Sequence, residues 1–267
     1  MSRYDFHMHT NFSSDSNATM ESMVRAGIQK GVTEVCFTDH VEFDPAPPYD
    51  EEVFDPFIYQ AEIERLRKIY GDQIEIRMGV EMGYQPHIVH RMNQFVSRVD
   101  FDFILCSLHS IDKLDFHTKA FFEGKTSEAA FENYFEVYYE CAKSDITFSV
   151  LSHFDFLKRY APYNGDQLFK DNFDLIEGTF KQLIEKGKGI EVNTSGFTRY
   201  KLGHSLPSAD FLRRYKELGG EIITTGSDAH SPRHVAEHFD VTCELLKSVG
   251  FRYITRFEKM KPAFIKL

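Results

Sequence analysis

The segment 3–16, RYDFHMHTNFSSDS, places two histidines, His7 and His9, at the end of a short apolar strand. Alternate residues of a strand point to the same side, so both imidazoles face one spot. Two imidazoles directed at one spot suit a metal ion better than a packed core. Asp15 follows closely and is a further candidate ligand, although aspartate in such a segment is also typical of a turn or helix cap.

Short apolar runs alternate with helical patterns along the 267 residues, without an internal repeat or a Gly/Ser linker. The expected strands are Tyr4–His9, Glu34–Thr38, Ile74–Val80, Phe101–Ser107, Thr147–Ser152, Gly189–Asn193 and Glu221–Thr225. The expected helices are Met20–Lys30, Pro56–Tyr70, Pro86–Val96, Ser127–Ala142, Phe169–Lys186, Ser208–Leu218 and Pro232–Ser248. This alternation favours an α/β fold with a parallel sheet, either a closed or nearly closed (β/α)7 barrel or, as the alternative, a doubly wound open sheet.

The composition excludes some classes of partner. A formal net charge of −10 argues against broad binding to nucleic acid, but it is compatible with a small phosphorylated ligand held by one or two arginines. The four cysteines are far apart and form no CxxC pair, which is typical of a reduced, cytoplasmic protein. We expect no signal peptide and no membrane span, since no apolar run approaches the roughly 20 residues that a span needs.

The C-terminal ends of the expected strands carry a repeated signal. Six of the seven strands run into a histidine or a carboxylate, and only strand 189–193 lacks an obvious ligand. In a parallel barrel all these ends open on one face, where the active site is built. The side chains expected to meet there as metal ligands are His7, His9, Asp15, His40, Glu81, His109, His153, Asp228 and His230.

These ligands are imidazoles and carboxylates without a thiolate, a set that suits Zn, Mn or Fe and does not select among them. They are too many for one ion, so we expect two or three divalent transition-metal ions. Asp39 is a weaker candidate, because it could instead orient a neighbouring ligand.

The pieces HMH, TDH, GVE, SLH, SHFD and GSDAH stand in the order of the PHP (polymerase and histidinol phosphatase) family, which this chain resembles from His7 to His230. The resemblance implies a single metallophosphoesterase domain over residues 1–267, folded as a distorted (β/α)7 barrel of TIM-barrel type. The opening DFHMHTNFS and the piece GVEMGY look most like the histidinol-phosphate phosphatase branch. That branch implies hydrolysis of L-histidinol phosphate to L-histidinol and phosphate in histidine biosynthesis.

The resemblance also implies three metal positions. One ion would be held by His7, His9, Glu81 and Asp228, a second by Glu81, His109 and His153, and a third by Asp15, His40 and His230. Glu81 would therefore bridge two ions. Many relatives have histidine at the position of Asp15, so the carboxylate here bears on the strength and metal preference of the third position.

The expected chemistry is in-line attack on phosphorus by a metal-bridged hydroxide. The candidate catalytic residues are Asp15, His40, Glu81 and Arg159, and either Asp15 or His40 would assist the leaving group. Two arginines that follow expected strands, Arg159 and Arg199, would hold the phosphate oxygens, unless they are simple surface residues.

Other substrate contacts are expected near the sixth strand and in the loop after the second. Asn193 and Ser195 could donate hydrogen bonds to the substrate, and Glu42 and Asp44 could complement an ammonium group.

Three alternatives remain open at this stage. The chain could be another PHP-type phosphoesterase with a nucleotide, oligonucleotide or phosphotyrosine substrate. It could be a non-catalytic metal-binding domain, although every ligand position is intact. It could also be an amidohydrolase-type enzyme, but those usually bridge their metals with lysine, where this chain has Glu81.

Overall fold

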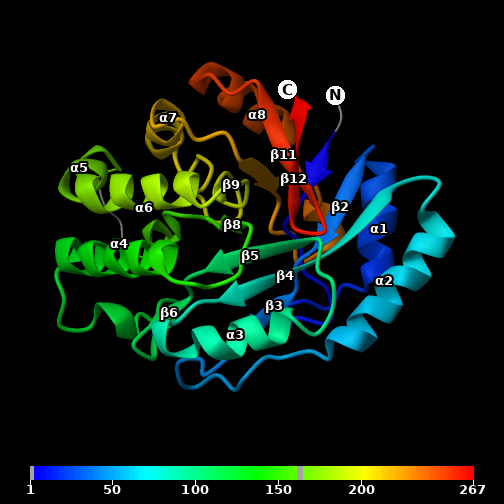
Figure 1. Ribbon diagram of the computed structural model, residues 1–267, viewed down its shortest axis with the longest axis horizontal. Helices are drawn as coiled ribbons and strands as arrows, with labels where there is room; N and C mark the ends of the chain where they lie inside the picture. Colours follow the sequence, from blue (N-terminus) through cyan, green and yellow to red (C-terminus); the bar gives the residue numbers. More distant parts are fainter. Residues whose placement is uncertain (1–2, 161–164) are drawn as a thin grey trace.

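The computed structural model describes residues 3–160 and 165–267. Its strands are β1 (Tyr4–Asp5), β2 (Glu34–Phe37), β3 (His40–Glu42), β4 (Glu75–Gly83), β5 (Phe103–Ser107), β6 (Ser110–Ile111), β7 (Leu114–Asp115), β8 (Val150–Leu151), β9 (Gly189–Asn193), β10 (Ile223–Gly226), β11 (Tyr253–Glu258) and β12 (Lys261–Lys266). Its α-helices are α1 (Met20–Gln29), α2 (Pro56–Tyr70), α3 (Val89–Val96), α4 (Ser127–Lys143), α5 (Gly165–Asp171), α6 (Phe173–Glu185), α7 (Ala209–Glu217) and α8 (Phe239–Val249). Figure 1 shows their arrangement.

The central sheet is parallel, with strand order β1-β2-β4-β5-β8-β9-β10 and β3 paired to β4 beyond the end of β2. Its two edges meet, because Phe6 N donates to Thr225 O at 2.9 Å and His9 N donates to Ala229 O at 2.8 Å. The barrel is distorted, since β1 and β8 contribute only two residues each to the ladder. The prediction of a distorted seven-stranded barrel of TIM type is confirmed within the described residues.

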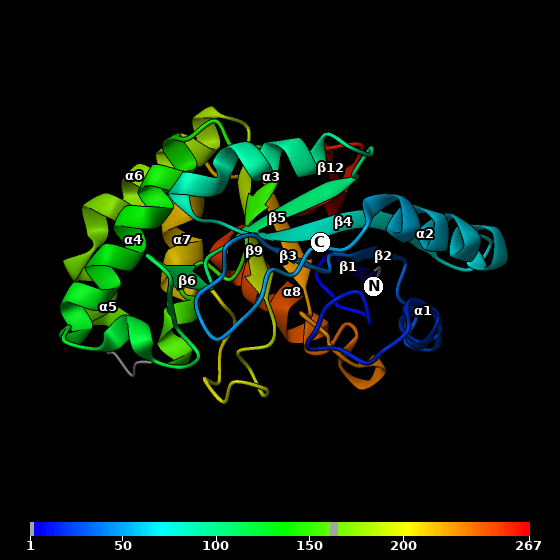
Figure 2. The same cartoon turned by 90° about the horizontal axis from the view of Figure 1, so that it is seen from below.

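Helices cover the outside of the barrel. Figure 2 shows α1 and α2 at one end of the molecule and α4, α5 and α6 at the other, with the strands between them. Phe154, just after β8, lies within 5.3 Å of the ring centres of Phe135, Tyr138 and Phe180, which come from α4 and α6. This aromatic layer buries large apolar surface between the barrel and its helices. No helix in the described parts of the chain is long and apolar enough to cross a membrane.

Several helices begin where the sequence predicts, because the residue just before each of them has a side chain that caps the helix. The Asp55 carboxylate accepts a hydrogen bond from Phe57 N, with Pro56 at the first helical position of α2. Thr19 and Thr126 cap α1 and α4 in the same way, accepting from Ser22 N and Ala129 N.

Three expected helices differ from the structure. The helix expected over Pro86–Val96 begins with a 3-10 turn at Pro86–Ile88, and the α-helix itself starts at Val89. The helix expected over Pro232–Ser248 begins only at Phe239, because a short 3-10 turn and the left-handed backbone of His238 (φ 62°) precede it. The helix expected over Phe169–Lys186 is divided at Asn172 into α5 and α6.

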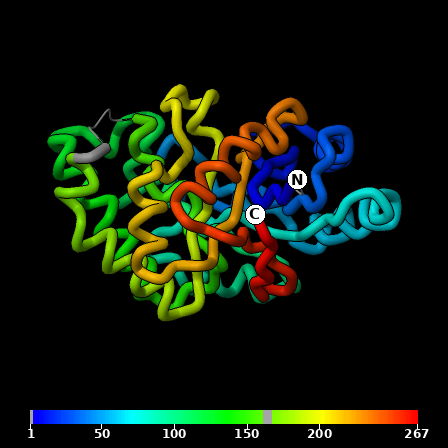
Figure 3. Tube along the Cα trace, turned by 90° about the horizontal axis from the view of Figure 1, so that it is seen from above, coloured from blue at the N-terminus to red at the C-terminus, as the bar shows by residue number. Residues whose placement is uncertain are grey.

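The C-terminal hairpin, β11 and β12, was not predicted. It covers the end of the barrel where the strands begin: Phe257 packs on Phe103 with ring centres 5.2 Å apart, and Thr255 Oγ1 accepts from Ile223 N. The Arg256 guanidinium lies 3.3 Å from the buried Glu34 carboxylate. Figures 1 and 3 show the hairpin beside the N-terminal segment of the chain. The hairpin therefore closes the end opposite to the predicted active site.

We expect Phe257→Ala to lower the free energy of unfolding by about 3–5 kcal/mol, because it opens a cavity against Phe103. Phe264→Ala, on the other strand of the hairpin and 49% exposed, should change it by less than about 0.5 kcal/mol. Urea denaturation followed by circular dichroism measures both. Equal effects of the two substitutions would show that the hairpin does not seal the barrel.

Candidate metal centre and active site

The C-terminal ends of the barrel strands bring the predicted ligands together. His7 and His9 follow β1 and are fully buried, with their Nε2 atoms 3.1 Å apart. The Nε2 atom of His7 also lies 3.1 Å from Glu81 Oε2. Two imidazole nitrogens and a carboxylate oxygen thus converge on one point, as the alternation of the first segment predicts.

Glu81, from β4, stands at the centre of the cluster and is 1% exposed. Its Oε1 atom lies 3.1 Å from His153 Nε2 and 3.5 Å from His109 Nε2. Its Oε2 atom lies 3.1 Å from the nearest nitrogen of His7, 3.3 Å from that of His9 and 3.2 Å from that of His40. Each oxygen therefore serves a different set of histidines, which is the arrangement that a bridging carboxylate requires.

The donor atoms fall into compact groups, each with its atoms within 4.8 Å of one another. Among the described residues the groups are His7/His9/Glu81, Glu81/His109/His153, His9/Asp15/His40/His230 and His40/Glu42/His109. The first three correspond to the three metal positions that the family resemblance implies. Asp228 lies outside these groups but close by, with Oδ1 3.5 Å from His9 Nε2 and 3.4 Å from His230 Nδ1.

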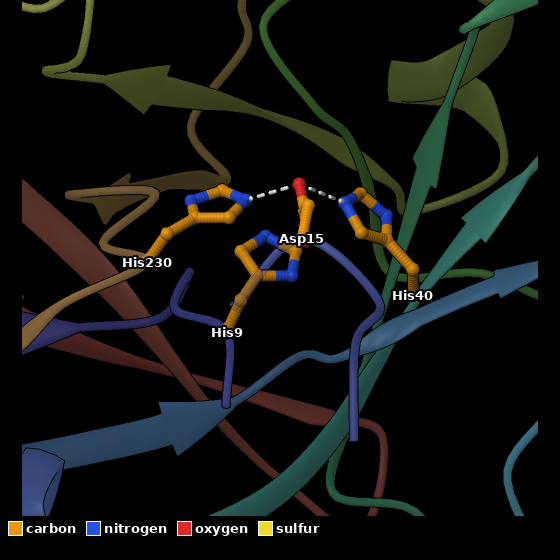
Figure 4. A group of neighbouring side chains, drawn as sticks. All are labelled: His9, Asp15, His40 and His230. Carbon is orange, nitrogen blue, oxygen red and sulfur yellow. Dashed lines mark ion pairs between the residues drawn. The ribbon is translucent and has the colours of Figure 1, made fainter. Parts of the chain in front are cut away.

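Figure 4 shows the third group, in which Asp15 points between two imidazoles. Its Oδ2 atom lies 2.8 Å from His230 Nε2 and 3.7 Å from His40 Nε2. His9 lies between the same two rings, with its ring centre 4.2 Å from each. His9 therefore belongs to both the first and the third group, whereas the resemblance assigns it to the first alone.

The charges of the cluster are strongly coupled. Burial alone would raise the pKa of Glu81, but the neighbouring His7 and His40 hold it well below its usual range. Burial would lower the pKa of His40, yet the charges of Glu81 and Asp15 raise it to about 9. For His9, burial and the charges of His230 and His40 lower the pKa well below its usual value. Buried imidazoles and carboxylates at such separations form a donor set that fits a cluster of divalent cations.

Asp39 lies beneath the ligands rather than among them. Its carboxylate accepts hydrogen bonds from the Thr10, Ser13 and Tyr59 hydroxyls at 2.8–3.0 Å. Ser13 Oγ in turn lies 3.2 Å from His9 Nδ1. Asp39 therefore acts on His9 through Ser13, which agrees with the orienting role considered from the sequence.

The sixth strand adds no residue to the donor groups of the described chain, but it places a carboxylate behind one of the ligands. Glu191 on β9 is fully buried, and its Oε1 atom lies 2.7 Å from His7 Nδ1. The pattern of strand-end residues does not predict Glu191, because Glu191 lies two residues before the end of its strand. A usable signal was present: a carboxylate in the apolar run GIEVN shares a face with Asn193.

A pocket of about 730 Å³ opens above the cluster. Its lining includes Glu81, the third group's Asp15, His40 and His230, and the loop from Pro45 to Glu52. Arg159 lines the same pocket, and its guanidinium carbon lies 3.9 Å from the ring centre of Tyr200. Among the described residues, Arg159 is the only arginine that lines this pocket.

The other expected substrate contacts lie elsewhere. The Arg199 guanidinium contacts Ser227 O at 3.0 Å and the Asp228 carboxylate at 3.3 Å, and Arg199 is not among the pocket-lining residues. Asn193 and Ser195 are buried and hydrogen-bonded to each other, also outside that lining.

The two acids expected to face an ammonium group have cationic or imidazole neighbours in the structure. Glu42 Oε1 lies 2.6 Å from His109 Nδ1, and Asp44 pairs with His87 and Lys113 at 2.8 Å. Of the two, only Glu42 lines the pocket.

A parallel barrel with a histidine and carboxylate cluster at its C-terminal rim defines the class of the barrel metallohydrolases. A model of the PHP domain matches residues 5–195, so the chain belongs to the PHP family. The chain is 30% identical over 263 residues to the histidinol-phosphatase of Lactococcus lactis subsp. lactis, covering 98% of this chain and 96% of that protein. It is 27% identical over 257 residues to a probable histidinol-phosphatase of Clostridium acetobutylicum, covering 96% and 97%.

A solved structure is similar over the same range. The crystal structure of the Lactococcus lactis histidinol phosphate phosphatase, complexed with zinc, L-histidinol and phosphate, matches with a TM-score of 0.88 at 28% identity. The match covers 98% of this chain and 99% of that one. The fold of this chain is therefore similar to that of the Lactococcus lactis enzyme over nearly its whole length.

We expect Asp15→Asn to lower the bound metal by about one ion per chain, because the amide lacks the charge that the third group supplies. The control is Asp240→Asn, at a surface carboxylate paired with Arg3. Elemental analysis after dialysis against metal gives the stoichiometry. An unchanged metal content in Asp15→Asn would remove Asp15 from the ligands.

Proposed function

We propose that the protein is a metal-dependent phosphatase that hydrolyses L-histidinol phosphate to L-histidinol and phosphate, a step of histidine biosynthesis. The observation that carries the proposal is the cluster centred on Glu81 at the floor of a pocket that also presents Arg159. The similar barrel of the Lactococcus lactis enzyme, with its zinc, L-histidinol and phosphate, supports the same reading.

The cations would be two or three divalent transition-metal ions, zinc, manganese or iron, held by the groups around Glu81 and Asp15. When bound, such ions lower the pKa of water towards about 7 and neutralise phosphoryl oxygens. The chain supplies the remaining requirements: it positions the ester, balances its charge and protonates the departing oxygen.

Of the residues that the structure describes, Arg159 is the one best placed to hold the phosphoryl group. Its planar guanidinium matches two phosphoryl oxygens at once, and its stacking on Tyr200 limits the orientations it can take. Asp15 and His40 both line the pocket at the exposed edge of the cluster. They are therefore the two candidates for assisting the leaving oxygen.

The pocket also suits the cationic part of the substrate. Its lining includes the carboxylates of Glu42, Asp50, Glu51, Glu52 and Asp115. Such a lining favours a small phosphate ester that carries an ammonium group. It disfavours a nucleic-acid strand, whose phosphates these acids would repel.

We also propose that residues 1–267 act as one catalytic domain in the cytoplasm. The four cysteines are free and buried, which suits a reducing compartment.

The experiment is a comparison of phosphate release from four substrates by the zinc-, manganese- or iron-loaded protein. The substrates are L-histidinol phosphate, p-nitrophenyl phosphate, a nucleotide and a phosphotyrosyl peptide. We expect the highest kcat/KM for L-histidinol phosphate and loss of activity on chelation, reversed by added metal. A preference for any other substrate contradicts the proposal.

Arg159→Met should lower kcat/KM for L-histidinol phosphate about 10- to 100-fold, the effect of removing a charge-assisted hydrogen bond. Arg98→Met serves as the control, because Arg98 is exposed and stacks on Phe57 outside the pocket. Steady-state kinetics at saturating metal measures both. An Arg159→Met enzyme as active as Arg98→Met would show that Arg159 does not hold the phosphate.

A further inference from the structure

Glu191 and His7 make contact across an intervening strand. Their strands are not neighbours, because β10 lies between β9 and the segment that begins with β1. Strands two places apart are separated by roughly 10 Å. Nevertheless, Glu191 Oε1 lies 2.7 Å from His7 Nδ1.

Gly226, on the intervening strand, makes this contact possible. A Cβ atom at position 226 would lie 2.1 Å from Glu191 Oε1 and 2.4 Å from His7 Cβ. The strand passes directly beside His7, since Asp228 N donates to His7 O at 2.7 Å. Only glycine leaves enough space at this position for the Glu191 side chain to cross β10 and reach His7.

The Glu191 carboxylate has partners on both oxygens. Oε1 faces His7 Nδ1, whereas Oε2 accepts the backbone N–H of His153 at 3.0 Å and lies 3.3 Å from Asn193 Nδ2. Glu191 is fully buried, and a buried charge with this many partners holds a fixed position. One carboxylate therefore fixes a side chain of the first ligand group and the backbone of the second.

The contact also determines which nitrogen of His7 faces the cluster. A carboxylate at Nδ1 keeps the proton on that atom and leaves the Nε2 lone pair free for a metal. Nε2 is the atom that lies 3.1 Å from both Glu81 Oε2 and His9 Nε2.

We propose that Glu191 is a positioning residue of the metal centre, reaching His7 through the gap that Gly226 leaves in β10. It holds His7 with Nε2 directed at the cluster and anchors the backbone at His153. The inference rests on the proposed metal centre but is independent of which phosphate ester is hydrolysed.

The test is zinc affinity, measured with the full-length protein in competition with a fluorescent chelator. Glu191→Gln keeps the size of the side chain but offers one acceptor oxygen, whereas three N–H groups are shared between the two oxygens of the carboxylate. We expect it to weaken zinc binding about 10- to 100-fold. The matched control is Glu34→Gln, another buried glutamate on a barrel strand, which pairs with Arg77 at the opposite end. It should lower the melting temperature and leave zinc affinity unchanged.

Excess zinc distinguishes a positioning role from a general loss of structure. At saturating zinc, Glu191→Gln should recover most of its kcat with an unchanged KM, whereas a misfolded variant would not recover. Gly226→Ala should weaken zinc binding at least as much; if it does not fold, Glu191→Gln alone decides.

The outcomes separate the two proposals. Zinc affinity of Glu191→Gln within twofold of the wild type overturns the positioning role and leaves the proposed function intact. A wild-type protein that binds no zinc, manganese or iron overturns both.

Discussion

The buried carboxylate of Glu81 is the constraint around which the active end of the molecule is organised. It is nearly inaccessible to water and has histidine nitrogens within 3.5 Å of both of its oxygens. Burying a carboxylate is unfavourable unless positive charge compensates it. The compensating groups come from the ends of different strands, so the cluster exists only when the barrel is closed.

The residues behind the cluster show how the barrel orients these groups. Two histidines of the cluster have an acid at their Nδ1 atom, while their Nε2 atom faces Glu81. Glu191 contacts His7 in this way, and Glu42 contacts His109. In both cases a glycine on the neighbouring strand provides the space, since a Cβ atom at Gly83 would lie 1.7 Å from Glu42 Oε2, just as one at Gly226 would meet Glu191. Glycines of a barrel strand can therefore be required by the side chains that cross them, not by their own backbone conformation.

The two ends of the barrel have different tasks. At the N-terminal end, the hairpin β11–β12 packs Phe257 on Phe103 and places Arg256 beside Glu34. These contacts are remote from the pocket and stabilise the fold. At the other end, the polar cluster faces a pocket. Loops line this pocket together with Arg159, whose guanidinium stacks on the ring of Tyr200. This division is typical of TIM-type barrels, in which chemistry is confined to the C-terminal rim.

The sequence by itself determined the order of the seven expected barrel strands and of the helices between them, because alternation of apolar residues is a local signal. It also determined helix α2 and strand β9 to the residue, and the side chains that meet at the rim, because capping residues and strand-end positions are local signals as well. It missed Glu191, which lies inside a strand, and the C-terminal hairpin, whose packing partners are distant along the chain. It also could not separate Arg159, which faces the pocket, from Arg199, which turns toward Asp228. Only the tertiary structure decided these points, since they depend on which strands become neighbours when the barrel closes and on where each long side chain finds an oppositely charged group.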